Sequence, residues 1–440
     1  MVLALSLVSL SLTGCGSYVA AGKPNAADAA HRSAKPYAGQ TITVLFPYNA
    51  PPRKLLAQFT AQTGIKVNWT VLGFAATWAK IVSASSANTY FADLTDVDWS
   101  RVGQYYRTKW FIPLNKYFNV KSLRSDVPQL NDFMVNGQLV GMPIDASLML
   151  TTVNVKDFAR AGITRLPTTI AQYTTDLRTL QRKGIHAHPL GISFAAQEGL
   201  STYWYEVTGA FGGSIFGPGY KPLFTSPSSA GYRAMQWMVN AYKSGLVPTS
   251  DINMVDYQVQ QSQMALHRIS SVMSDYSGNV GTLYNVPSQS KVVGQIKYIP
   301  TPGIKGIGPN LGNPDGMGIP VTAKHPGAAA VFLKWFTSPQ MQADFSGLHG
   351  PADEILNFPL PMRLSSMNML QKANKVTQVN EMIMLFRQHS RPVFPNGGPP
   401  PWYPQFSNAV YTNIHSAALG QESVAQAIQA ISNTVNQLNH

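Results

Sequence analysis

The sequence predicts an α/β protein with two lobes and a ligand cleft between them. Its 440 residues exceed the roughly 250–300 at which a single hydrophobic core stops growing, so two cores are expected. Apolar runs of strand character alternate with helical segments along the chain, which is the pattern of α/β lobes. Residues 141–154 and 312–320 each have the features of a passage from one lobe to the other.

The composition excludes a disordered chain and narrows the classes of possible binding partner. Hydrophobic residues make up 45% of the chain and charged residues only 12%, about half of the roughly 25% usual in soluble domains. There are 33 Lys and Arg against 20 Asp and Glu, a net charge of +13. A positive charge of this size would suit binding to nucleic acid, to an anionic membrane face or to an anionic ligand, and it would also suit an acidic habitat. The basic residues are dispersed, which argues against nucleic acid, and the scarcity of carboxylates favours an acidic habitat.

The first residues have the features of a secretion signal. An apolar run at 2–12 is too short to span a bilayer comfortably and leads to Cys15, the chain's one cysteine. Leu12-Thr13-Gly14-Cys15 resembles the bacterial lipobox, in which the peptide before the cysteine is removed and the cysteine is acylated. The alternative is a secretory signal with an incidental cysteine. No Lys or Arg precedes the apolar run, which points to a translation start further upstream.

This resemblance divides the N-terminal part of the chain. We expect a lipoprotein signal peptide at 1–14, lipidation of Cys15 and a flexible tether at 15–39, which is rich in Ala, Gly, Ser, Lys and Pro. Acyl chains would then hold the protein to a membrane without a transmembrane helix.

The folded part is predicted to open with a β-α-β unit: a strand at 41–46, a helix at 51–59 and a strand at 66–72. Tyr48 and Asn49 follow the first strand, at the carboxyl end where open α/β sheets bind ligands. They are therefore candidate ligand-binding residues.

A further helix at 77–86 leads to a short strand at 94–97, after which come Asp98 and Trp99. A carboxylate beside an indole can accept the hydroxyl hydrogens of a polyol and offer it an apolar platform. Alternatively, Asp98 caps the next helix and Trp99 is a surface aromatic. Both interpretations remain open at this stage.

The segment 141–154, GMPIDASLMLTTVN, is the one around which the chain is organised. Pro143 biases the residue before it toward an extended conformation, and 148–153 is an apolar, β-branched strand. We expect this strand to leave one lobe, present Asp145 at the gap and enter the other, where small-molecule sites tend to lie. The second expected crossing, the glycine-rich loop 312–320, contains Asp315 and matches no phosphate-binding motif.

The second lobe is predicted to hold helices at 154–162, 170–184 and 226–245, and strands at 271–273 and 297–299. Three successive aromatics at 203–205 cannot all be buried on one helical face, so at least one is expected to line a groove. His186 and His188 would suit a metal ion. Because no carboxylate or third histidine is near them in sequence, we expect a surface loop and no metal.

The C-terminal part is predicted to contain helices at 326–337 and from 339, helical stretches after Met362, and an amphipathic helix from Glu422. Between them lies a proline-rich loop, 395–404. The side chain of Trp402 in this loop either packs into a corner of the fold or is exposed as a platform for a sugar ring. We favour the exposed platform.

Four segments, in this order behind the lipobox, carry a resemblance to a family: ADLTDVDWSRVGQYYRTKWFIPLNKYF, QLVGMPIDASLMLTTVNVKDFARAGI, MGIPVTAKHPGAAAVFLKWFTSPQMQADF and ALGQESVAQAIQAI. They resemble the extracellular solute-binding proteins of family 1, the maltose-binding-protein-like lipoprotein receptors of carbohydrate ABC importers. The resemblance covers nearly everything after Gly39.

The resemblance implies an α/β, two-lobed periplasmic-binding-protein-like fold (type II), with a ligand cleft between lobes joined by two or three crossings. Lobe 1 would comprise 40–148 and 313–361, and lobe 2 would comprise 149–312 and the C-terminal helices of 362–440.

The resemblance also implies a function. The protein would be an extracytoplasmic receptor, and no enzyme, that closes its lobes around a sugar or oligosaccharide and delivers it to the membrane permease. We expect a monomer without cofactor, metal or nucleic acid, anchored to the outer face of the cell membrane by acylated Cys15. The candidate ligand-binding residues are Tyr48, Asn49, Asp98, Trp99, Asp145, Glu198, Trp204, Asp275, Tyr276, Asp315 and Trp402.

Asp98, Asp145 and Glu198 are expected to accept the ligand's hydroxyl hydrogens, and Trp99 and Trp204 to stack on its apolar faces. The chain departs from the family at Tyr90-Phe91-Ala92, where many members have Gly-Pro before the aspartate. It departs again at Val153, where Tyr-Asn is usual. The pocket is therefore expected to differ there.

The sequence also leaves other functions open. The same fold would serve a receptor for a sugar phosphate or for ferric ion; the adjacent Tyr105 and Tyr106 would suit iron, but they fall on a predicted helix. A secreted glycosidase would need two carboxylates roughly 5 to 10 Å apart. Asp98 and Asp145 would be its candidates, although no flanking motif supports them.

Overall fold

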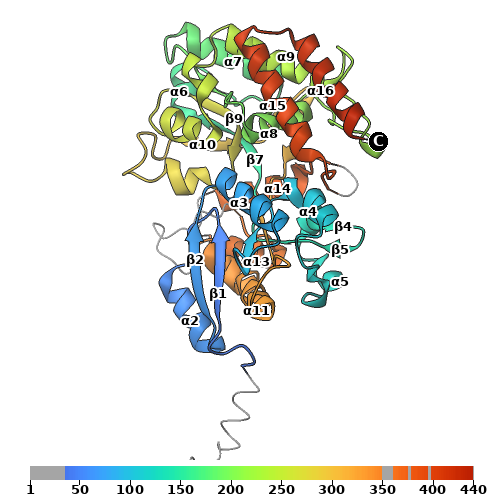
Figure 1. Ribbon diagram of the computed structural model, residues 1–440. Helices are drawn as coiled ribbons and strands as arrows, with labels where there is room; N and C mark the ends of the chain where they lie inside the picture. The colour runs from blue at the N-terminus through green and yellow to red at the C-terminus, as the bar shows by residue number, and fades with distance from the viewer. Residues whose placement is uncertain (1–34, 349–359, 375–377, 395–397, 440) are drawn as a thin grey trace, which may run out of the picture.

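The computed structural model describes residues 35–348, 360–374, 378–394 and 398–439. The predicted signal peptide, Cys15 and most of the predicted tether lie outside these residues. The described chain forms two lobes, each built on its own β-sheet (Figure 1). The predicted α/β, two-lobed fold is therefore confirmed.

Lobe 1 is built on a five-stranded sheet with the order β2 (Lys66–Val71), β1 (Thr41–Phe46), β3 (Leu94–Asp96), β14 (Gly316–Gly318) and β6 (Met142–Pro143). β1 pairs in parallel with β2 and β3, whereas β14 runs antiparallel to β3 and β6. β14 belongs to the part of the chain that returns from lobe 2. The sheet of lobe 1 is thus completed by a late strand.

Its helices are α2 (Arg53–Thr63), α3 (Phe74–Ser86), α4 (Val102–Thr108), α5 (Val120–Leu123), α11 (Pro326–Phe336) and α12 (Pro339–Phe345), with a small hairpin of β4 (Met134–Val135) and β5 (Gln138–Leu139). Phe59 on α2 packs edge-on against Phe332 on α11, with ring centroids 5.2 Å apart. Residues 35–39 also belong to this lobe, because Tyr37 packs against its core and the Gly39 N–H donates to Gly64 O at 2.8 Å.

Lobe 2 is built on a four-stranded sheet with the order β10 (Ile296–Ile299), β7 (Met149–Asn154), β9 (Ser271–Tyr276) and β8 (Leu190–Gly191). Its helices are α6 (Val155–Arg160), α7 (Ile170–Arg182), α8 (Glu198–Ala210), α9 (Ala230–Lys243), α10 (Asp256–Val259), α15 (Tyr403–Leu419) and α16 (Val424–Leu438). Local signals set many of these bounds. Thr169 and Gln172, for example, form a complete capping box at the start of α7.

Helix α15 was not predicted, and the loop predicted at 395–404 extends over its first two residues. Pro404 instead lies in the first turn of the helix, where its missing N–H costs nothing. Gly420 ends the helix with a φ of 76°. α15 and α16 pack against each other and against α9 in lobe 2 (Figure 1).

Helix α8 buries all three of its successive aromatics, and Tyr203 among them lines a small cavity, as predicted for at least one of them. Every residue from Leu200 to Ala210 is buried, because the helix is covered by the sheet on one side and by α9 and α15 on others. A helix enclosed in this way buries side chains all round its axis.

Three passages connect the lobes, in agreement with the predicted two or three crossings. The first, 144–148, joins β6 to β7, and the second, 300–315, joins β10 to β14; they form a bridge between Leu148 and Gly312. The third runs through α14 (Val379–His389) and β15 (Ser390–Arg391), which pairs with β13 (Asn310–Leu311) of the second passage. A hairpin of β11 (Pro302–Gly303) and β12 (Gly306–Ile307) also lies in the second passage.

The segment 362–440 is divided between the lobes. α13 (Leu364–Ala373) packs against α12, and the Arg363 guanidinium lies 2.8 Å from the Asp126 carboxylate. These contacts place α13 on lobe 1, whereas α15 and α16 lie on lobe 2. Among the described helices, none combines the length and the apolar character needed to span a bilayer.

Candidate functional site

Carboxylates gather where the two lobes meet. Asp96 ends β3 and Asp98 follows it, Asp145 follows β6, Asp315 precedes β14, and Glu198 opens α8 of lobe 2. Electrostatic interactions link Asp315 to Asp145, Asp98 and Asp96, and link Glu198 to Asp98. A quarter of the 20 carboxylates of the chain are therefore in one place. The interface between the lobes is acidic although the protein is basic.

Backbone and hydroxyl donors hold these carboxylates in position. Asp98 caps the 3₁₀ turn η1 (Trp99–Arg101), where its Oδ1 accepts from the Ser100 N–H at 2.7 Å and from the Ser100 hydroxyl. The prediction that Asp98 caps the next helical segment is therefore confirmed, whereas Trp99 is buried and is not a surface aromatic. Asp145 Oδ1 accepts from the Asp315 N–H at 2.7 Å, and Asp315 in turn accepts from the Tyr48 hydroxyl.

Two of these acceptors lack a partner. Asp96 is fully buried and Asp145 is 1% exposed, yet Asp96 Oδ1 and Asp145 Oδ2 have no hydrogen bond within the described protein. Burial raises the pKa of Asp145 to about 7, and burial together with the neighbouring charges raises that of Asp315 well above its usual value. A buried acceptor without a donor costs about 1–3 kcal/mol, so a donor supplied by a ligand would be favourable here.

Arg101 lies among the carboxylates and links the lobes. Its Nη2 is 4.0 Å from Glu198 Oε2, and its guanidinium lies 4.3 Å from the centre of the Trp78 ring. Trp78 donates its indole N–H to Asp96 Oδ2 at 2.8 Å. The Arg101 charge therefore opposes the repulsion between acidic groups on the two sides of the interface.

Replacing Arg101 with leucine is expected to open the lobes, because Glu198 and the lobe 1 carboxylates would then face each other without a counter-charge. The radius of gyration in small-angle scattering should rise relative to the wild type. Arg53→Leu, at an exposed position on α2, is the matched control and should leave it unchanged. Equal values for all three proteins would contradict this role.

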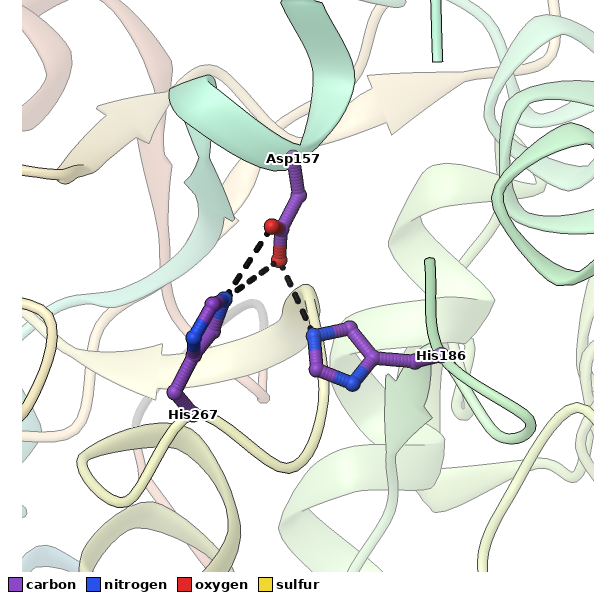
Figure 2. A group of neighbouring side chains, drawn as sticks. All are labelled: Asp157, His186 and His267. Carbon is purple, nitrogen blue, oxygen red and sulfur yellow. Dashed lines mark hydrogen bonds and ion pairs between the residues drawn. The ribbon is translucent and has the colours of Figure 1, made fainter. Parts of the chain in front are cut away.

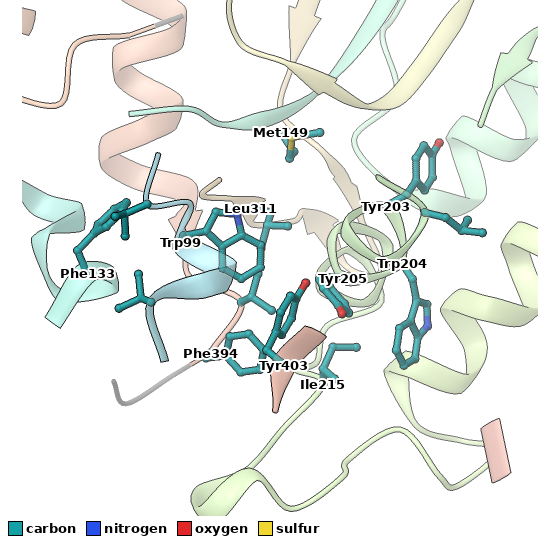
Figure 3. Packing of buried hydrophobic residues seen from close by; sticks show 14 of the residues in the cluster. Trp99, Phe133, Met149, Tyr203, Trp204, Tyr205, Ile215, Leu311, Phe394 and Tyr403 are labelled. Atoms are coloured by element: carbon teal, nitrogen blue, oxygen red, sulfur yellow. The ribbon is translucent and has the colours of Figure 1, made fainter. Parts of the chain in front are cut away.

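Aromatic rings from both lobes lie beside the carboxylates. Trp99 donates its indole N–H to Asn313 and packs against Tyr403 of α15, with ring centroids 5.5 Å apart. Tyr403 donates its hydroxyl to Glu198, which also accepts from the Ser407 hydroxyl at 2.9 Å. Figure 3 shows Trp99, Tyr403 and Tyr205 gathered between the turn η1 and helix α8. These contacts join the two lobes.

A small cavity adjoins the carboxylates on the lobe 2 side. Its lining includes Ser193, Thr202, Asp256, Gln260, Ser274 and Tyr276. Gln260, 3% exposed, begins a π-helical turn, a conformation often found at functional sites. Its Nε2 and the Ser274 Oγ have no partner within the described protein. Tyr276 donates to Asp256 at 2.6 Å and also interacts electrostatically with Asp315 and Asp98. The cavity therefore offers donors without a partner, at Gln260 and Ser274.

Four predicted residues are not brought into this arrangement. Trp204 is fully buried and donates its indole N–H to Gly231 O at 2.8 Å, on the side of α8 that faces away from Trp99 (Figure 3). Asp275 is fully buried and accepts from Thr152 and Tyr284 at 2.7 and 2.6 Å. Trp402 is 8% exposed and packs among Phe216, Tyr220 and Phe406, so it forms a packed corner instead of the predicted platform. Asn49 is exposed beside Tyr48.

The described part of the interface also contains residues that the sequence did not single out as binding residues. Arg101 lies two positions after Trp99, so its place at the interface could have been inferred from the predicted position of Trp99. Asp256, Gln260 and Ser274 carry no local signal, because no motif distinguishes them and only the packing of the π-helical turn after α10 against β9 brings them to the cavity.

Buried carboxyls make stability depend on pH. Burial raises the pKa of Asp145 and Asp251 to about 7, above their values in the unfolded chain. Such groups stabilise the fold while protonated, and this contribution is lost as the pH rises from about 4 through 7. The midpoint of thermal unfolding is expected to be about 5 °C higher at pH 5 than at pH 8. A midpoint that rises with pH would contradict this prediction and the acidic habitat proposed from composition.

Among the described residues, one group has the donors to hold a metal ion: Asp157, His186 and His267, which lie in lobe 2 away from the carboxylate cluster.

Comparison with known proteins agrees with this architecture. Residues 47–343 match the model of the bacterial extracellular solute-binding protein family. No curated protein matches the chain in sequence. Among solved structures, maltose-bound MalE3 of T. maritima has a TM-score of 0.78 at 18% identity, over 91% of this chain and 100% of that one.

Two further structures have the same TM-score of 0.78. One is a ribitol complex of an ABC transporter solute-binding protein from Agrobacterium radiobacter K84, at 19% identity over 91% of this chain and 99% of that one. The other is such a protein from Thermotoga lettingae TMO bound to α-D-tagatose, at 18% identity over 91% of this chain and 100% of that one. Likeness at these identities shows the fold. The family match, which spans more than half of the chain, shows that this protein belongs to the bacterial extracellular solute-binding proteins.

Proposed function

We propose that the protein is the extracytoplasmic receptor of an ABC importer that closes its lobes around a sugar or polyol and delivers it to the membrane permease. The observation that carries this proposal is that buried polar atoms lack partners both in the carboxylate cluster, at Asp96 Oδ1 and Asp145 Oδ2, and in the lining of the cavity, at Gln260 Nε2 and Ser274 Oγ. A hydroxyl group both donates and accepts hydrogen bonds. A molecule rich in hydroxyls can therefore satisfy both sets at once.

The rings at the interface support the same ligand class. Tyr276 lines the cavity, and Trp99 and Tyr403 border the carboxylates. Aromatic faces pack against the apolar faces of sugar rings, while carboxylates accept from the hydroxyls at their edges. The maltose, ribitol and tagatose in the structural neighbours are ligands of the same class. We infer that Tyr48, Asp98, Trp99, Asp145, Glu198, Tyr276 and Asp315 are the ligand-binding residues among those predicted.

The charge of the interface argues against the alternatives. A sugar phosphate would meet a cluster of carboxylates with Arg101 as its counter-charge, which disfavours an anion. Tyr105, a candidate iron ligand, is 1% exposed and stacks on Phe111 with centroids 4.7 Å apart. We propose no catalysis, since the family consists of binding receptors.

We further propose that the protein is a monomer that acylated Cys15 anchors to the outer face of the membrane. A Cys15→Ser variant expressed in a bacterial host should then move from the membrane fraction to the soluble fraction. Retention in the membrane fraction would contradict the anchor without affecting the receptor assignment.

Thermal unfolding tests the ligand class. The protein starting after Cys15 would be heated with mono- and oligosaccharides, polyols, sugar phosphates and ferric ion. A ligand at 100 times its Kd adds about 2.7 kcal/mol of stability, which raises the unfolding midpoint by a few degrees. A shift with neutral sugars or polyols, with the ligand recovered unchanged, is expected. A shift with only phosphates or iron would overturn the assignment.

A further inference from the structure

A second group of polar side chains lies at the far end of the lobe 2 sheet. β7 begins at Met149, which pairs with Tyr276 beside the cavity, and ends at Asn154. Asp157 follows on α6, and Val153 pairs with Ser271 at the start of β9. The length of β7 therefore separates this end of the sheet from the ligand interface, by about 17 Å at 3.3 Å per residue.

Three segments distant in sequence meet there. Asp157 projects from α6, His186 follows α7, and His267 precedes β9. Figure 2 shows both imidazoles pointing at the one carboxylate. His186 Nε2 lies 3.1 Å from Asp157 Oδ2, and His267 Nε2 lies 3.0 Å from both carboxylate oxygens. The two rings meet edge to face with centroids 4.9 Å apart.

These separations match those of ligands around one metal ion. Zinc bonds of about 2.0–2.1 Å in tetrahedral geometry place neighbouring ligand atoms roughly 3.3 Å apart. The nitrogen–oxygen distances of 3.0 and 3.1 Å need to lengthen by only a few tenths of an ångström. All three donor atoms lie within 4.8 Å of one another, so little further movement would enclose an ion.

The surroundings suit a metal that can enter from solvent. The Asp157 side chain is 1% exposed, whereas those of His186 and His267 are 13% and 30% exposed. Ser270 donates to Asp157 Oδ2 at 2.9 Å and orients the carboxylate, as outer-shell donors do in metal sites. Arg160 Nη1 lies 3.4 Å from Asp157 Oδ1 and would repel a cation, but this side chain is 60% exposed and can turn away.

We propose that Asp157, His186 and His267 form a binding site for a divalent transition metal ion of the zinc type. Two imidazoles and one carboxylate suit Zn²⁺, Co²⁺ or Ni²⁺, whereas Ca²⁺ and Mg²⁺ prefer oxygen ligands. Water would take the remaining position, and the ion would replace the protons that the imidazoles donate to Asp157. The bound ion would tie α6, the segment after α7 and the turn before β9 together, and so stabilise lobe 2.

Co²⁺ absorption tests this site without any variant. Untagged protein starting after Cys15, treated with chelator and dialysed, is titrated with Co²⁺. One equivalent should give visible bands of a four- or five-coordinate site, Zn²⁺ should displace it, and Zn²⁺ should raise the unfolding midpoint. Absence of a saturable cobalt spectrum would overturn the proposal.

Matched variants assign the ligands. His186→Gln and His267→Gln should each weaken Zn²⁺ binding more than tenfold, with unfolding in chelator showing that each variant is folded. His188→Gln is the control, because its imidazole Nδ1 instead bonds Gly245 O at 2.7 Å. Arg160→Ala should tighten binding. Equal affinity of the wild type and both ligand variants would place any bound zinc elsewhere and overturn the assignment.

Discussion

Replacing Glu206 with alanine is expected to destabilise the protein by about 3–5 kcal/mol, the range for breaking a buried charge pair. Glu206 lies on α8 and is fully buried. Its Oε1 accepts from the Thr301 hydroxyl and its Oε2 from the Leu311 N–H, both at 2.7 Å. Both donors belong to the second passage between the lobes, so one carboxylate holds that passage against lobe 2.

The buried charge of Arg391, in the third passage, is also stabilised by Glu206. Burial lowers the pKa of Arg391, and the Glu206 charge opposes this effect. Its Nη2 donates to Tyr205 O at 2.5 Å, whereas its Nε has no partner within the described protein. The guanidinium lies so close to α8 that a Cβ on Gly209 would be 2.3 Å from Nη2. Without Glu206, this buried cation would lose its counter-charge.

Chemical denaturation of Glu206→Ala and Glu206→Gln measures the effect. Glutamine keeps an acceptor and a donor of similar shape, so it should cost less than alanine. Glu422→Ala, just before α16 and only partly buried, should change stability by less than about 0.5 kcal/mol. A loss below 1 kcal/mol for Glu206→Ala would show that the passages are held by other contacts.

Replacing Asp145 with asparagine is expected to weaken ligand binding by about 10- to 100-fold, because hydrogen bonds to charged groups contribute about 1.5–3 kcal/mol. The amide oxygen can still accept from the Asp315 N–H, as Asp145 Oδ1 does at 2.7 Å. The amide nitrogen replaces Oδ2, the oxygen without a partner, and cannot accept a hydroxyl hydrogen. The fold should remain intact, since burial already raises the pKa of Asp145 to about 7.

Calorimetric titration with the sugar or polyol identified by thermal unfolding checks this prediction. Glu422→Gln removes a carboxylate far from the interface and serves as the matched control. An affinity of Asp145→Asn within twofold of the wild type would mean that the crossing-strand carboxylate does not contact the ligand. The wild-type unfolding shift would then still stand as evidence for a receptor.

The local elements of the fold could be predicted because local interactions set them. The strand at 41–46 has the predicted bounds, and the helix at 170–182 begins at a cap that the sequence already contains. The crossing strand and Asp145 were predicted from one proline and one apolar run. Alternation and capping depend on neighbours within about four residues, so the sequence alone carries that information.

Local patterns and chain length were thus enough to predict the α/β class, the two lobes, the main crossing and the aspartates at its edge. Which side chains lie where the lobes meet depends instead on how the folded chain packs. Trp204 and Trp402 are aromatic in the same way as Trp99, but α8 and the aromatic corner enclose them. Gln260 and Ser274 line one cavity with Tyr276, and His186 meets His267 and Asp157, across sequence distances that no local pattern spans. Exposure and convergence are properties of packed elements, and packing depends on long-range contacts that periodicity does not encode.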